Sequence, residues 1–90
     1  MKQPKTYTIE CNRFSYTGTS STTATGTIQE LIEHYRYTLE CGKAYEHERG
    51  NKKIDIEPKT IKSLVTNLNN AANNVAANGN SGKQYTLVTE

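Results

Sequence analysis

Residues 45–53 form the chemically richest segment of the chain, because they bring an aromatic ring, an imidazole and several cationic side chains together. Tyrosine can stack on a nucleobase, and guanidinium and ammonium groups can hold a phosphate. The candidate ligand-binding residues of this segment are Tyr45, Arg49, Asn51, Lys52 and Lys53. Cations near a helix C-terminus also complement the helix dipole without any ligand. The segment therefore predicts either an anion-binding site or an ordinary charged connection.

A stripe of polar side chains follows one flank of the apolar face of a predicted helix: Ser63, Asn67, Asn70, Asn74 and Asn78. Each interior Asn costs roughly 0.5 kcal/mol of helix propensity relative to Ala, so the stripe indicates polar pairing. A carboxamide donates and accepts together, which suits an adenine edge as well as pairing within the structure. Asn67, Asn70 and Asn74 are candidates for either role, whereas Asn69 and Asn73 are expected on a solvated face.

Catalytic and metal-binding patterns are weak in this sequence. His47 lies between Glu46 and Glu48, but adjacent residues of a helix do not face each other. His34 and Cys41 are too few for zinc, which takes four ligands in structural sites. We therefore expect a non-enzymatic protein without a cofactor or a metal.

Length and charge narrow the class further. Ninety residues with 33% apolar side chains predict a single domain, residues 1–90, with a lean core. A net charge of +2 excludes a strongly acidic DNA mimic and gives little support to nucleic-acid binding. No apolar run approaches the roughly 20 residues that span a membrane, and the N-terminus does not resemble a signal peptide. We expect a cytoplasmic protein with reduced thiols at Cys11 and Cys41.

Two alternating segments, residues 7–11 and 14–17, predict strands of a hairpin, with Asn12 and Arg13 as its turn. The following residues, 18–26, are rich in Thr, Ser and Gly and predict a mobile loop or a poorly ordered edge strand. A last short strand is expected around Tyr85 and Leu87.

Two helices are expected between these strands. The first begins at Thr27, which forms a capping box with Glu30, and continues to Arg49 before a left-handed stop at Gly50. The second covers residues 60–78, with Asp55 or Glu57 as its cap and Pro58 in its first turn. Its apolar side chains share one face: Ile61, Leu64, Val65, Leu68, Ala71, Ala72 and Val75.

The order strand, strand, helix, helix, strand predicts an α+β fold, in which two helices pack on one face of a small antiparallel sheet of three or more strands. An unpaired sheet edge and a lean core favour a homo-oligomer.

Three segments, residues 26–32, 45–54 and 58–64 with the asparagines after them, resemble small accessory proteins of tailed phages. Among characterised phage proteins the chain is similar to the Thoeris anti-defence nucleotide sponges. This resemblance implies a small cytoplasmic protein of the host cell that assembles and sequesters a nucleotide-derived immune signal without turning it over.

On this interpretation the nucleotide lies between subunits. Tyr45 or Tyr16 stacks on the base, the cations Arg49, Lys52 and Lys53 hold phosphate, and Asn67, Asn70 or Asn74 reads the base edge. The main alternative is an anti-CRISPR-type inhibitor that binds a host defence protein complex. A weak nucleic-acid-binding module is the second alternative.

Overall fold

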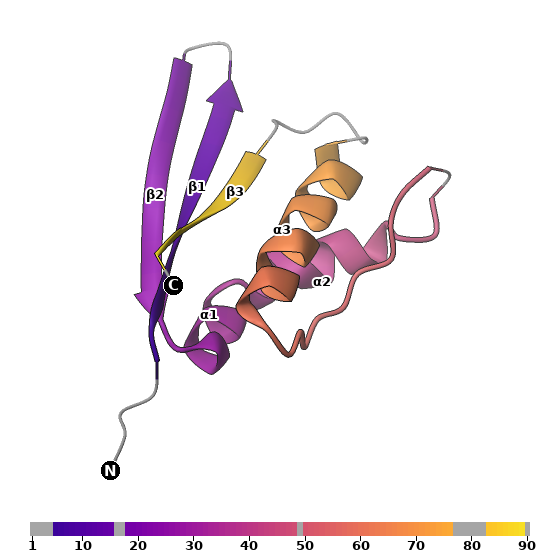
Figure 1. The fold of residues 1–90 in the computed structure, drawn as a ribbon. Helices are drawn as coiled ribbons and strands as arrows, with labels where there is room; N and C mark the ends of the chain where they lie inside the picture. Colours follow the sequence, from indigo (N-terminus) through magenta and orange to yellow (C-terminus); the bar gives the residue numbers. More distant parts are fainter. Residues whose placement is uncertain (1–4, 16–17, 49, 77–82, 90) are drawn as a thin grey trace.

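The computed structural model describes residues 5–15, 18–48, 50–76 and 83–89. In these residues, three strands form an antiparallel sheet with the order β2-β1-β3, and helices pack on one of its faces (Figure 1). The predicted α+β class and antiparallel sheet are confirmed. The described residues form three helices rather than the predicted two. None of these helices is both long and apolar enough to cross a membrane.

The central strand β1 covers Tyr7–Ser15 without interruption, so the prediction of a turn at Asn12 and Arg13 is wrong. Asn12 is paired with Ser21 of β2 on one side and with Gln84 of β3 on the other. Pairing on both sides uses backbone groups that a turn would withdraw from the ladders. Residues 16 and 17, the end of the predicted second strand, lie outside the described residues.

The edge strand β2, Gly18–Gly26, pairs with β1 in a regular antiparallel register along its whole length. Of the two predictions for this segment, the edge strand is the one that the structure contains. Thr is a good strand former, and an edge strand with one solvated face needs little apolar surface. Only Gly26 at its end is buried, and Ala24 is half-buried.

The first helix begins as predicted. The Thr27 hydroxyl accepts from the Glu30 N–H at 3.2 Å, and the Glu30 carboxylate accepts from the Thr27 N–H at 2.9 Å, which completes the capping box. The helix does not continue to Arg49. It divides at Tyr35 into α1, Ile28–His34, and α2, Arg36–Ala44.

Tyr35 leaves helical geometry at this division, with φ −100° and ψ 10°. Its buried ring packs edge-on against the ring of Tyr85 in β3, with 5.6 Å between the ring centroids. The change of direction at Tyr35 therefore lets α1 lie near the end of β2 while α2 packs against the following helix. Gly50 has a positive φ of 84°, as predicted, but it lies in the connection after α2 rather than at the helix end.

Helix α3, Ile61–Ala76, is the second predicted helix, and the predicted apolar face is the buried one. Its cap differs from the prediction. The Thr60 hydroxyl accepts from the Ser63 N–H at 3.1 Å, whereas the Asp55 carboxylate accepts from the Glu57 N–H at 2.9 Å and so turns the preceding connection. Pro58 is buried before the helix rather than within its first turn.

The core lies between the sheet and the helices. Its buried apolar side chains come from strands β1 and β3, from the three helices with the junction at Tyr35, and from the connection between α2 and α3. They are Ile9, Leu31, Ile32, Tyr35, Leu39, Ile54, Ile61, Leu64, Leu68, Ala71, Ala72 and Tyr85. Ile54 was not expected there, because it belongs to the polar connection between α2 and α3. This connection therefore packs against the core with fixed geometry, which restricts where its polar side chains can point.

Candidate functional site

A cavity of about 380 Å³ opens between helices α2 and α3 and the adjoining ends of strands β1 and β3. Two cations line it, together with two tyrosines, two small polar side chains and an apolar floor: Arg13, Lys83, Tyr37, Tyr45, Thr38, Cys41, Ala71, Ala72 and Val75. All of these lining residues belong to one chain, and a ligand held between subunits stays a prediction.

The two cations of the cavity, Arg13 and Lys83, are direct cross-strand partners on β1 and β3. Like charges that face each other on neighbouring strands destabilise a sheet. Neither cation forms an ion pair with another described residue. Two uncompensated cations at one level of the sheet create a positive potential that an anion would relieve.

The aromatic side of the cavity comes from α2 and its C-terminal end. Tyr37 is 81% exposed, and Tyr45 is half-buried. The neighbouring Cys41 side chain, chiefly through a hydrogen bond, raises the pKa of the Tyr37 hydroxyl. Tyr37 is therefore neutral near pH 7, and the face of its ring is free to stack on a flat ligand.

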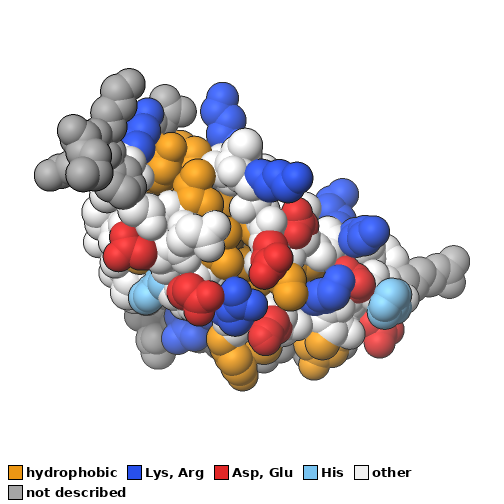
Figure 2. All heavy atoms as spheres, turned by 90° about the horizontal axis from the view of Figure 1, so that it is seen from below, with side chains coloured by type: hydrophobic (Ala, Val, Ile, Leu, Met, Phe, Trp, Pro, Cys, Tyr) orange, Lys and Arg blue, Asp and Glu red, His pale blue; other side chains and the backbone are white. Residues whose placement is uncertain are grey.

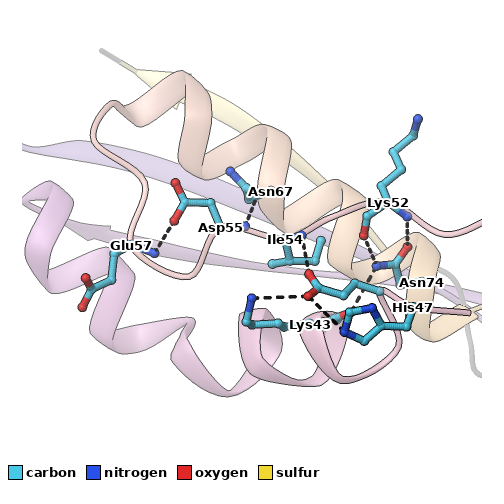
Figure 3. Close-up of polar contacts among 10 residues, drawn as sticks. Lys43, His47, Lys52, Ile54, Asp55, Glu57, Asn67 and Asn74 are labelled. Atoms are coloured by element: carbon cyan, nitrogen blue, oxygen red, sulfur yellow. Dashed lines mark hydrogen bonds and ion pairs between the residues drawn. The ribbon is translucent and has the colours of Figure 1, made fainter.

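The predicted phosphate-binding segment has a different arrangement. Tyr45 lines the cavity, but Lys52 and Lys53 do not, and both lie exposed in the connection. The Lys52 side chain points away from α3 (Figure 3). Asn51 donates from Nδ2 to the Tyr45 carbonyl oxygen at 2.7 Å. The predicted residues Arg49 and Tyr16 lie outside the described residues.

Asn67 and Asn74 hold this connection against α3. The Asn67 Oδ1 accepts from the Asp55 N–H at 2.8 Å (Figure 3). The Asn74 side chain accepts from the Lys52 N–H at 3.0 Å and donates to the Lys52 carbonyl at 2.8 Å and to the Gly42 carbonyl at 3.1 Å. Asn74 is 1% exposed. Of the two roles open for these residues, pairing within the structure is the one observed.

The other asparagines of α3 differ from one another. Asn69, expected on a solvated face, instead bonds both backbone groups of Tyr85: its Nδ2 donates to the carbonyl at 2.9 Å, and its Oδ1 accepts from the N–H at 2.7 Å. That expectation was wrong because β3 lies beside this flank of α3. Asn73 is exposed as expected, and Asn70 is half-buried.

Glu46 is a further structural residue of the connection. Its carboxylate accepts from the Ile54 N–H at 3.0 Å and lies 3.4 Å from the Lys43 ammonium and 3.6 Å from the His47 imidazole. The Ile54 N–H, and to a smaller extent Lys43, hold the pKa of Glu46 below its ordinary value. The His47 side chain is 90% exposed and lies outside the cavity. The contacts of Glu46 therefore hold the connection in place and do not form a site for a ligand.

Charged side chains are mixed on the face that lies at the bottom of Figure 1. Figure 2 shows acidic and basic groups interspersed there, without a continuous basic surface. Nucleic-acid binding usually needs clustered cations, so this face offers none of the support that such a function needs. Among the described residues, no group of His, Cys, Asp or Glu could hold a metal ion. Cys11 and Cys41 carry free thiols.

Neither Arg13 nor Lys83 was among the predicted site residues: Arg13 was expected in a turn, and the expected last strand was described only around Tyr85 and Leu87. A signal for both was present. Arg13 is in phase with Ile9 and Cys11, and Lys83 is in phase with Tyr85, so an uninterrupted strand would direct both cations to the face that carries the helices.

The cavity thus combines paired cations, aromatic rings and an apolar floor, which are the groups that bind an anionic ligand with a flat ring system. We compared the chain with protein-family models, with curated proteins and with solved structures, and no match was found in any of the three.

Proposed function

We propose that this chain is a phage-type, non-enzymatic anti-defence protein that sequesters a nucleotide-derived immune signal in the cavity between α2, α3 and the sheet. The observation that carries the proposal is the facing pair Arg13 and Lys83 on one side of a cavity whose other side holds Tyr37 and Tyr45. The anti-defence role, and the cytoplasm of the host cell as its place of action, rest on the resemblance to phage nucleotide sponges.

The arrangement of the cavity fits a nucleotide in one orientation. A phosphate between Arg13 and Lys83 would receive charge-assisted hydrogen bonds, which are about twice as strong as neutral ones. The base would then lie over the apolar floor and against a tyrosine ring, since stacking tolerates every base. A volume of about 380 Å³ is near the lower end of the range for small-molecule sites, which favours a ligand of mononucleotide size.

The lining of the cavity favours binding over turnover. Among the described residues that line it, the polar groups other than the cations and tyrosines are Thr38 and Cys41, and none is a histidine or a carboxylate. Histidine is the side chain that most often transfers protons in general acid–base catalysis, and the ionisable groups that line this cavity are instead those of Arg, Lys, Tyr and Cys. A site of this composition can hold and retain a nucleotide, as a sponge must do.

Thermal melting against cyclic nucleotides and ADP-ribose derivatives tests the proposal. A ligand held at about 100 times its dissociation constant should add about 2.7 kcal/mol of stability. Arg13→Ala and Lys83→Ala should each weaken binding by roughly 1.5–3 kcal/mol, the range for hydrogen bonds to charged groups. Lys52→Ala and Lys53→Ala are matched controls, because these exposed cations lie outside the cavity. Mass spectrometry of the recovered ligand should find it unchanged.

Two results would contradict the proposal. If no compound of the panel raises the melting temperature, cyclic nucleotides and ADP-ribose derivatives are excluded as ligands of the protein. An equal loss of affinity in the Lys52→Ala and Arg13→Ala variants would move the ligand away from the cavity.

The alternative is an inhibitor that binds a host defence protein. One observation favours it: the face of the sheet opposite the helices lies open in the described part of the chain, and Val88 is 52% exposed there. Under this alternative the melting panel stays flat, and a defined host effector complex loses activity when the protein is added.

A further inference from the structure

The two edges of the sheet differ in the state of their backbone groups. On the β3 edge, the Asn69 carboxamide of α3 occupies both the N–H and the carbonyl of Tyr85. This side chain pairs with Tyr85 as a neighbouring strand would, so α3 closes this edge at its centre. No described element covers the β2 edge in the same way, because β2 is the terminal strand on that side.

The register identifies which backbone groups of β2 point outward. Tyr85 directs its groups toward Asn69, so its partner Cys11 directs its own groups toward β2 and exchanges hydrogen bonds with Thr22. Backbone groups of successive residues in a strand point in opposite directions, so four residues must direct their N–H and carbonyl groups away from β1: Thr19, Ser21, Thr23 and Thr25.

Side-chain contacts agree with this assignment. The Ser21 hydroxyl donates to the Asn12 Oδ1 at 2.5 Å, and the hydroxyls of Thr8 and Thr25 lie 2.9 Å apart. Opposed side chains are closest at pairs that do not exchange backbone hydrogen bonds. Ser21 and Thr25 therefore occupy such pairs, which leaves their N–H and carbonyl groups directed to the open edge.

Strand β2 also lacks the features that keep a free edge from pairing. Proteins protect such edges with charges, prolines, bulges or very short strands. Gly18–Gly26 contains no charged residue and no proline, and its register with β1 has no bulge. By contrast, a register shift near Thr8 interrupts the pairing of β1 with β3.

We propose that a second copy of this chain binds to the β2 edge, so that two β2 strands pair antiparallel and the two sheets become one. The two-fold axis passes beside Thr22. Thr19 then exchanges hydrogen bonds with Thr25 of the other copy, and Ser21 does so with Thr23. This register pairs the whole strand with itself, and because the strand is uncharged, no like charges oppose each other.

The antiparallel arrangement fits the rest of the molecule. Helix α1 follows Gly26 directly, so the two α1 helices lie at opposite ends of the junction and do not compete for space. All helices of the dimer lie on one face of the joined sheet, because directly opposed residues point to the same face. The cavity receives no residue from β2, so each copy keeps its own complete cavity.

Sedimentation equilibrium over roughly 10–500 µM, the range in which weak dimers associate, measures whether the chain dimerises through the β2 edge. The wild-type protein should be a dimer. Thr23→Pro removes one outward N–H, a change that an edge strand tolerates, and should raise the dimer dissociation constant at least about tenfold. Thr23→Val keeps this N–H and should leave the dimer intact. A monomeric wild-type protein, or a Thr23→Pro variant that dimerises like the wild type, would overturn the proposal.

A cysteine at the axis tests the register independently of proline. The two Thr22 residues oppose each other across the axis as a pair that exchanges no backbone hydrogen bonds, since their backbone groups are directed to β1. The Cα atoms of such a pair lie about 4.5 Å apart, within the range of about 4.4–6.8 Å for a disulfide. With Cys11 and Cys41 replaced by Ala, Thr22→Cys should give a covalent dimer on mild oxidation. Ser20→Cys, on the same face and strand, should give none, because it lies opposite position 24 of the other copy. Failure of Thr22→Cys to cross-link, or equal cross-linking by both variants, would refute this register.

Discussion

Gly42 of α2 and Ala71 of α3 lie so close that a Cβ on Gly42 would overlap the Cα and Cβ of Ala71. A glycine inside a helix costs about 1 kcal/mol relative to alanine. Here the missing side chain lets the two helices approach each other, and Leu39 and Leu68 are fully buried in the same core. Gly42, which weakens α2 as an isolated helix, is thus what allows α2 to pack on α3.

We expect Gly42→Ala to lower the free energy of unfolding by about 1–3 kcal/mol, the usual cost of overpacking a core, although alanine is the better helix former. Urea unfolding of both proteins measures the difference. Glu40→Ala is the control, because this side chain is exposed on the same helix and its loss should change little. A Gly42→Ala variant more stable than the wild type would show that the helices separate without cost.

Helix α3 could be predicted from the sequence because its apolar period is long and regular. The capping box at Thr27 could also be predicted, because it depends only on residues close together in the sequence. The division at Tyr35 could not be predicted in the same way. The apolar period continues across it, and the contact that stabilises it, with the Tyr85 ring, comes from the other end of the chain.

The candidate site was predictable only in part, for a similar reason. Tyr45 belongs to a dense local cluster, whereas Arg13 and Lys83 lie far apart in sequence and meet through the pairing of β1 with β3. The polar pair Asn12 and Arg13 is typical of a turn when read alone. Its place in a central strand depends on partners on both sides, which a local pattern does not contain.

Asn74→Ala should lower the free energy of unfolding by about 1–3 kcal/mol, because it removes the partner of the buried Gly42 carbonyl and of the partly buried N–H and carbonyl of Lys52. The neighbouring Asn73→Ala is the matched control. Asn73 is exposed, so its replacement should gain about 0.5 kcal/mol of helix propensity. Equal unfolding free energies for the two variants would show that the bridge between α3 and the connection contributes nothing.

Glu46→Gln should destabilise the protein near neutral pH and have a smaller effect in acid. The hydrogen bond from the Ile54 N–H and the Lys43 charge lower the pKa of Glu46 in the folded state. A lowered pKa stabilises the fold above the unfolded-state value, about 4.5, and this contribution is lost as the pH falls through the folded-state pKa. The difference in melting temperature between wild type and variant should therefore shrink below about pH 4.5.

Glu48→Gln is the control for this pH dependence, since the Glu48 side chain is exposed in the same connection. Its melting curve should follow the wild type at every pH. A Glu46→Gln difference that grows on acidification would reverse the assigned direction of the Glu46 pKa.

Tyr37→Ala should weaken nucleotide binding by about 1–3 kcal/mol, the usual value of stacking one base on an aromatic ring, without changing the stability of the free protein. The reason is its position: the ring lines the cavity yet is 81% exposed, so it contributes little to the core. Tyr37→Phe keeps the ring but removes the hydroxyl, and should bind as the wild type does. Calorimetric titration with the nucleotide that gives the largest melting shift compares the three proteins. If Phe and Ala lose affinity equally, the hydroxyl rather than the ring contacts the ligand, and if neither loses affinity, the base does not lie on Tyr37.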